Sequence, residues 1–180
     1  MDNAMNAYTW ATEFHALFGR SAVKYLSGNT EFSSWFGLDE VAFLKSFGYK
    51  PREFFDFVED HCNEDGGEPS AASALLVAAV RRDYFLVEQK GVPSAKVVPA
   101  GTLPPKSAEM DGIPWLPRII AKAEAKLCGE MDPNTMFGCG GDRAFLDKHR
   151  INPADFLRVV WAARGDAGKV LGFVKTGKYF

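Results

Sequence analysis

Apolar residues recur every three to four positions along most of this chain, which is the spacing that places them on one face of an α-helix. Between Tyr8 and Leu26 that face carries Phe14 and Phe18, and Gly28 follows as a residue that can end a helix with a positive φ. The same pattern predicts further helices that begin near residues 39, 51, 70, 114, 142, 152 and 166. The predicted fold class is therefore all-α.

Capping residues set the expected boundaries of the later helices. Asn152 and Pro153 suit the N-cap and the first position of one helix. Asp142 suits the N-cap of the short helix before it, which should end near His149.

Two segments lack a helical pattern. Residues 63–69 are polar, acidic and glycine-bearing, so we expect a linker there. Prolines and glycine exclude regular helix from residues 92–111, which predicts an extended crossover with one short strand over residues 95–98.

The first and last thirds of the chain resemble each other. At an offset of 101 residues Phe36-Gly37 falls on Phe137-Gly138, and after one inserted residue Pro51 falls on Pro153. We interpret this as an internal duplication, so two helical units should pack about a pseudo-twofold axis in one domain. The units span residues 8–60 and 112–162, joined by a long helix and a proline-rich crossover over residues 69–111.

Composition and charge exclude several classes of function. The formal net charge is −2, and the one basic stripe, Arg118, Lys122 and Lys126, is too small for a nucleic-acid binder. The longest apolar run, residues 70–80, is too short to span a bilayer, and the first residues do not resemble a secretory signal. We therefore expect a cytoplasmic protein that binds neither nucleic acid nor membrane.

Cysteine and histidine usage predicts no metal site and no cofactor. The three cysteines are odd in number and form no Cys-x-x-Cys pair, so reduced thiols are expected. The histidines and nearby acids lack the spacing of metal ligands.

Several short motifs carry a family resemblance. They are Leu116-Pro117-Arg118, Leu127-x-Gly129, Cys139-x-x-Asp142-x-x-Phe145-Leu146 and Phe156-Leu157. On these motifs the chain resembles a bacterial family known only as a domain of unknown function, number 5069 in that series, most strongly over residues 112–174. The resemblance implies a cytosolic bacterial protein of unassigned activity, and it supplies no catalytic residue.

The loop before residue 143 is the main candidate for a binding site. Gly140 and Gly141 allow successive backbone N–H groups to point one way at a helix start, where a phosphate or carboxylate can bind. Arg118 and Arg143 would supply counter-charge, whereas Asp142 would repel an anion. Two interpretations stay open, a site for a small anionic ligand and an ordinary structural turn.

Cys139 lies in the same loop. The helix dipole and Arg143 would favour a thiolate there, which describes a reactive nucleophile or redox sensor. Spacing alone identifies no partner histidine, and His149 is one candidate. The alternative is a buried, inert thiol.

Charged residues in the middle of the long helix form a further candidate. Arg82 and Asp83 lie beside aromatic residues and would line a cavity between the two units, together with Trp115. The alternative is that they form ordinary ion pairs.

Two functions from different classes follow. The first is a small-molecule binding protein or enzyme, for an anionic ligand, with its pocket near Gly138–Arg143. The second is a non-catalytic interaction or structural module, self-associating as a homodimer through exposed aromatics such as Trp10, Trp35 or Tyr179-Phe180.

Overall fold

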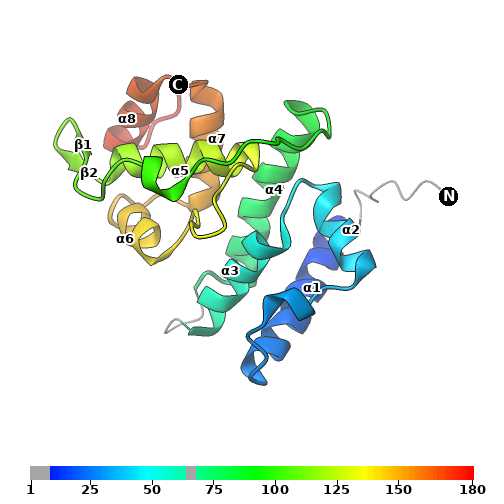
Figure 1. Cartoon of the computed structure of the whole chain (residues 1–180). Helices are drawn as coiled ribbons and strands as arrows, with labels where there is room; N and C mark the ends of the chain where they lie inside the picture. The colour runs from blue at the N-terminus through cyan, green and yellow to red at the C-terminus, as the bar shows by residue number, and fades with distance from the viewer. Residues whose placement is uncertain (1–8, 64–67) are drawn as a thin grey trace.

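The computed structural model describes residues 9–63 and 68–180, and over these residues the chain is all-α, as predicted (Figure 1). The helices are α1 (Trp10–Leu26), α2 (Leu38–Ser46), α3 (Pro51–Asn63), α4 (Ala71–Val87), α5 (Leu116–Cys128), α6 (Gly140–Lys148), α7 (Pro153–Ala163) and α8 (Ala167–Thr176). Short 3-10 turns occur at Phe32–Ser34 and Ala100–Thr102. None of the helices in these ranges has the length and apolar character that crossing a membrane requires. The linker predicted at residues 63–69 lies largely outside the described residues.

Helix α4 lies between two groups of helices (Figure 1). Helix α1 packs on α3 in one group and α5 packs on α7 in the other, while α4 contacts α1, α5 and α7. Helix α1 ends at Leu26 and α5 at Cys128, and α2 ends at Ser46 and α6 at Lys148, a spacing of 102 residues in both cases. The order of elements is thus the same in both groups, and the duplication itself stays a prediction.

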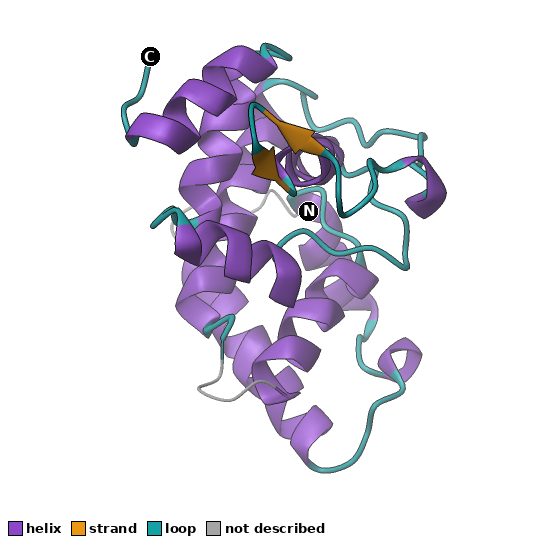
Figure 2. Ribbon diagram, turned by 90° about the vertical axis from the view of Figure 1, so that its left-hand side faces the viewer, coloured by secondary structure: helices purple, strands orange, loops and turns teal. Residues whose placement is uncertain are grey.

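The crossover contains a β-hairpin at residues 109–114, which the sequence pattern does not predict. Strands β1 (Glu109–Met110) and β2 (Ile113–Pro114) pair antiparallel, and Figure 2 shows them in orange beside the helices. Asp111 and Gly112 between them have φ of 52° and 74°, the conformation that a tight two-residue hairpin turn requires.

The strand predicted over residues 95–98 is wrong. Only Val98 of that segment pairs, in an isolated parallel bridge to Met131, and its N–H donates to Glu130 O at 2.8 Å. Pro99 follows and has no N–H, so the ladder cannot continue.

Local capping is confirmed at α7 and wrong at α6. The Asn152 side chain accepts a hydrogen bond from Ala154 N–H at 2.9 Å, with Pro153 as the first helical residue. Helix α6 begins three residues earlier than expected, with Cys139 as its N-cap, so Asp142 lies in its first turn. The reason is tertiary, because the Asp142 carboxylate is held by groups from outside its own helix.

The apolar core runs through both groups of helices. Trp10 and Trp35 belong to it, at 5% and 1% exposed, so neither can form the self-association surface expected of them. Tyr179 and Phe180 are exposed, as that hypothesis requires. Of the aromatic residues named for the self-association hypothesis, Tyr179 and Phe180 are therefore the two that the structure leaves exposed.

Candidate functional site

Helix α5 carries the cations Arg118, Lys122 and Lys126 on successive turns. The last two are buried, at 3% and 2% exposed. Lys122 pairs with Asp142 of α6, and Lys126 pairs with Glu53 of α3 at 2.7 Å. Two of the three charges are therefore neutralised inside the protein, and they present no basic surface to a polyanion.

The buried carboxylate of Asp142 organises the glycine loop. It accepts hydrogen bonds from Gly138 N–H and from Trp115 Nε1–H, both at 2.9 Å, and from the Lys122 ammonium group. The Gly138 N–H and the Lys122 ammonium group thus bind a carboxylate of the protein itself. An external anion would need other donors.

The glycines of the loop have a packing role. Gly140 and Gly141 are the first two residues of α6. A Cβ at Gly141 would lie 2.6 Å from Trp115 Cζ2, so only glycine lets the indole approach the helix closely enough to reach Asp142. This favours the structural interpretation for Gly141.

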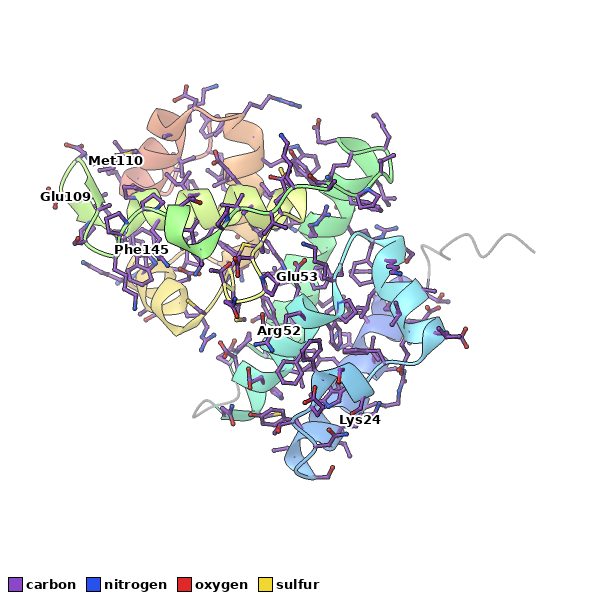
Figure 3. The ribbon with its side chains drawn as sticks, in the orientation of Figure 1. Lys24, Arg52, Glu53, Glu109, Met110 and Phe145 are labelled. Atoms are coloured by element: carbon purple, nitrogen blue, oxygen red, sulfur yellow. The ribbon has the colours of Figure 1, made fainter. Side chains whose placement is uncertain are left out.

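A hollow of about 410 Å³ lies beside this loop, between α3 and α5. We call it the α3–α5 hollow, and Figure 3 labels Arg52 and Glu53 on the α3 side, near the middle of the molecule. It is lined by Arg52, Asp56, Glu59, Asp60, Arg118, Lys122, Pro133, Asn134, Thr135, Met136 and Cys139. One wall comes from the first group of helices and the other from the second.

The acidic wall of the hollow comes from α3. Asp56 pairs with Arg52 Nε at 2.8 Å, and Asp60 accepts from Arg143 Nη1 at 2.6 Å. The Glu59 side chain has no hydrogen bond or ion pair to any residue that the structure describes. Glu59 therefore contributes a negative charge without a counter-charge.

The basic wall comes from α5. Lys122 is neutralised by Asp142, whereas Arg118 donates from Nη1 to the carbonyl oxygen of Pro104 at 2.7 Å. Within residues 9–63 and 68–180, no carboxylate pairs with Arg118. The half-buried guanidinium is thus held in position while its positive charge stays available.

Burial raises the pKa of Asp56 to about 6. Arg52 and Lys126 act in the opposite direction, and the neighbouring carboxylates Glu59 and Glu53 add to the rise. A carboxyl group that titrates near 6 can gain or lose a proton close to neutral pH.

Cys139 lines the same hollow as the N-cap of α6. Lys122 Nζ donates to its sulfur at 3.2 Å, so the thiol contacts an ammonium group. The candidate partner His149 lies past the opposite end of α6, and its ring packs on Phe145 with centroids 4.6 Å apart. The structure therefore removes His149 as a candidate partner of Cys139.

The remaining predicted site residues lie at the edge of the hollow or away from it. Arg143 donates to Asp60 and to Gly138 O at the edge of the hollow, and it lines a neighbouring hollow of about 490 Å³. Arg82 and Asp83 pair with each other at 3.3 Å, and the Arg82 guanidinium lies over the Trp10 ring of α1. The structure therefore gathers Arg118, Cys139 and Asp142 in one place and leaves Arg82 and Asp83 outside it.

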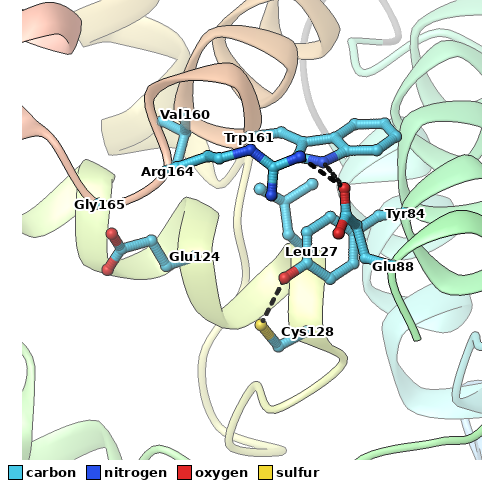
Figure 4. A pocket seen from close by; sticks show the side chains of 9 residues that line it. All are labelled: Tyr84, Glu88, Glu124, Leu127, Cys128, Val160, Trp161, Arg164 and Gly165. Carbon is cyan, nitrogen blue, oxygen red and sulfur yellow. Dashed lines mark hydrogen bonds and ion pairs between the residues drawn. The ribbon is translucent and has the colours of Figure 1, made fainter.

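Another hollow, of about 280 Å³, lies between α4, α5 and α7 (Figure 4). Glu88 Oε1 accepts from Trp161 Nε1–H at 2.9 Å and from Arg164 Nη2–H at 3.1 Å. Burial, together with the contact to Cys128, raises the pKa of Tyr84 to about 12. Most polar groups of this hollow already hydrogen-bond to one another. It is therefore the weaker candidate for a ligand-binding site.

Sequence reasoning missed the acidic wall. Its members Asp56 and Asp60, together with the buried Glu53, recur every three to four residues and so share one face of α3, as the three cations share one face of α5. Complementary charge on one face of each of two helices is the signal that could have paired them.

Comparisons of the chain with models of known protein families, with curated proteins and with solved structures find no match. The resemblance to the bacterial family of unknown function therefore stays a prediction.

Proposed function

We propose that the α3–α5 hollow binds a small anionic molecule and that Arg118 holds its anionic group. The observation that carries this proposal is the state of the Arg118 guanidinium, which is fixed by the Pro104 carbonyl and has no carboxylate partner among the described residues. A guanidinium presents its N–H groups in a fixed fork that matches a carboxylate or phosphate.

The size and lining of the hollow support a small molecule. Its volume of about 410 Å³ lies in the range of known ligand pockets. Its walls combine apolar surface from Pro133 and Met136 with charged groups on both sides. Such a mixture orients a ligand through a few polar contacts.

The proximity of Cys139 gives the site a thiol beside the ligand. A molecule anchored at Arg118 shares the hollow with the sulfur and with the Lys122 ammonium group. Binding should therefore shield Cys139 from alkylation, and Cys128, outside the hollow, serves as an internal control.

The test is calorimetric titration with succinate, citrate and inorganic phosphate. We expect at least one anion to bind the unmodified protein, and Arg118→Gln to weaken that binding at least tenfold. The matched control is Arg158→Gln, which removes an exposed arginine of α7 that pairs with Asp155. Equal affinity in the unmodified protein and in Arg118→Gln would overturn the proposal.

A further inference from the structure

A second, smaller cavity adjoins the α3–α5 hollow. It measures about 10 Å³ and shares the residues Asp56, Thr135 and Met136 with the hollow. We call it the Glu53 cavity, since Glu53 and its partner Lys126 both line it. Its size suits one water molecule or one ammonium group.

The carboxylate of Glu53 is only half satisfied. Its residue is 7% exposed, and Oε2 accepts from Lys126 Nζ at 2.7 Å. Oε1 is buried and has no hydrogen-bond donor among the described residues. Burying a carboxylate oxygen without a donor is unfavourable, so this position favours a group that brings N–H or O–H to it.

The charges around the cavity favour a cation at that position. Glu53 and Asp56 line it, and Glu59, which has no described partner, lies close enough to Asp56 to act on its pKa. Lys126 is the one cation in the cavity wall among the described residues, and Arg52, which pairs with Asp56 at 2.8 Å, lines the α3–α5 hollow and not the cavity. Arg81 also attracts Glu53, but it lines neither cavity and donates to other groups, Gly48 O and Gln89 Oε1.

We infer that the ligand carries an ammonium group as well as its anionic group, with the ammonium in the Glu53 cavity and the anion on Arg118. This inference rests on the proposed function, and it names the ligand class as an amino acid whose charged groups are separated. Arg118 and Lys126 are eight residues apart on α5, which is about 12 Å along the helix axis. This backbone spacing sets the scale of the ligand, and an extended chain of about six carbons, with a hydrogen bond at each end, matches it.

The test compares ε-aminocaproate with caproate, which lacks only the amino group. Calorimetry should show at least tenfold tighter binding of ε-aminocaproate to the unmodified protein. Arg118→Gln should weaken both probes to a similar degree. Glu53→Gln should remove the preference for the amino group.

A second variant keeps the test independent of folding. Glu53→Gln leaves Lys126 without its carboxylate partner, so Asp56→Asn provides the same test at a residue that lines both cavities. It should reduce the preference for ε-aminocaproate at least threefold. The matched control is Glu124→Gln, which removes an acid of α5 outside both cavities.

The outcomes separate this inference from the proposed function. Equal affinity for the two probes, with binding that depends on Arg118, would mean that the cavity holds water alone, so the inference fails while the proposed function stands. Binding of neither probe overturns the inference. If succinate, citrate and phosphate also fail to bind, the proposed function fails with it.

Discussion

Lys126 Nζ on α5 lies 2.7 Å from Glu53 Oε2 on α3, in an ion pair that is almost wholly buried between the two groups of helices. The ammonium group also lies 4.0 Å from the centroid of the Tyr49 ring. Burial alone would lower the pKa of Lys126, but Glu53 and Tyr49 outweigh it, so the pKa is raised and the lysine stays charged.

Removing one partner of this pair should destabilise the protein strongly. Lys126→Met leaves the Glu53 carboxylate buried without its counter-charge, which costs about 3–5 kcal/mol. The free energy of unfolding, measured by circular dichroism in urea, should fall by that amount. The double variant Glu53→Leu, Lys126→Met should recover most of the loss, because both charges are then absent. A single variant as stable as the unmodified protein would show that water reaches the pair.

Gly129 should be less tolerant of substitution than Gly91. Both have positive φ, 68° and 76°, but a Cβ at Gly129 would lie 2.4 Å from Arg81 Nη2, whereas a Cβ at Gly91 would meet nothing within 4 Å. Arg81 is 1% exposed and is held by Gly48 O and Gln89.

We therefore expect Gly91→Ala to lower the free energy of unfolding by about 1–2 kcal/mol from backbone strain alone. Gly129→Ala should lower it by about 3 kcal/mol or more, since a displaced guanidinium adds to that strain. Urea unfolding of the two variants side by side measures the difference. Equal losses would mean that Arg81 moves aside at no cost.

Asp56 should make the protein less stable as the pH rises from about 4 to about 6. Burial raises its pKa from 3.8 to about 6; Arg52 and Lys126 oppose the rise, and Glu59 and Glu53 add to it. The folded state then binds the proton more tightly than the unfolded chain does. The Asp56 contribution is fully present below pH 4, and it is lost as the pH passes 6, by an amount on the order of 3 kcal/mol.

Urea unfolding of the unmodified protein and Asp56→Asn at several pH values measures this effect. The variant should gain stability relative to the unmodified protein as the pH rises through 6. Asp155→Asn, which removes an exposed acid of α7, is the control and should show no such trend. If the difference in the free energy of unfolding between the unmodified protein and Asp56→Asn stayed constant at every pH measured, that would contradict the raised pKa of Asp56.

The sequence predicts the fold well where the determinants are local. The end of α5 at Gly129 and the cap of α7 at Asn152 depend on residues within one turn, so their types alone indicate the boundaries. The Asp111-Gly112 hairpin is equally local, and its dipeptide is a hairpin signal that the proline-rich surroundings obscure.

The candidate site is less predictable because its contacts join distant parts of the chain. Lys126 meets Glu53, 73 residues away, and Lys122 meets Asp142, 20 residues away. A periodic pattern assigns both lysines to a polar face, since it treats every charge as solvated. An acid in the first turn of a helix is also compatible with more than one capping position, so the sequence favours Asp142 as the N-cap although the true N-cap is Cys139, three residues earlier.

The contacts that begin at Trp115 have a spectroscopic consequence. The indole N–H binds Asp142, Asp142 binds Lys122, and Lys122 binds Cys139 on the wall of the hollow. A change of charge at the sulfur is therefore transmitted through one ion pair to the chromophore. With the other three tryptophans replaced by phenylalanine, the emission of Trp115 becomes an optical reporter of events in the α3–α5 hollow that needs no added dye.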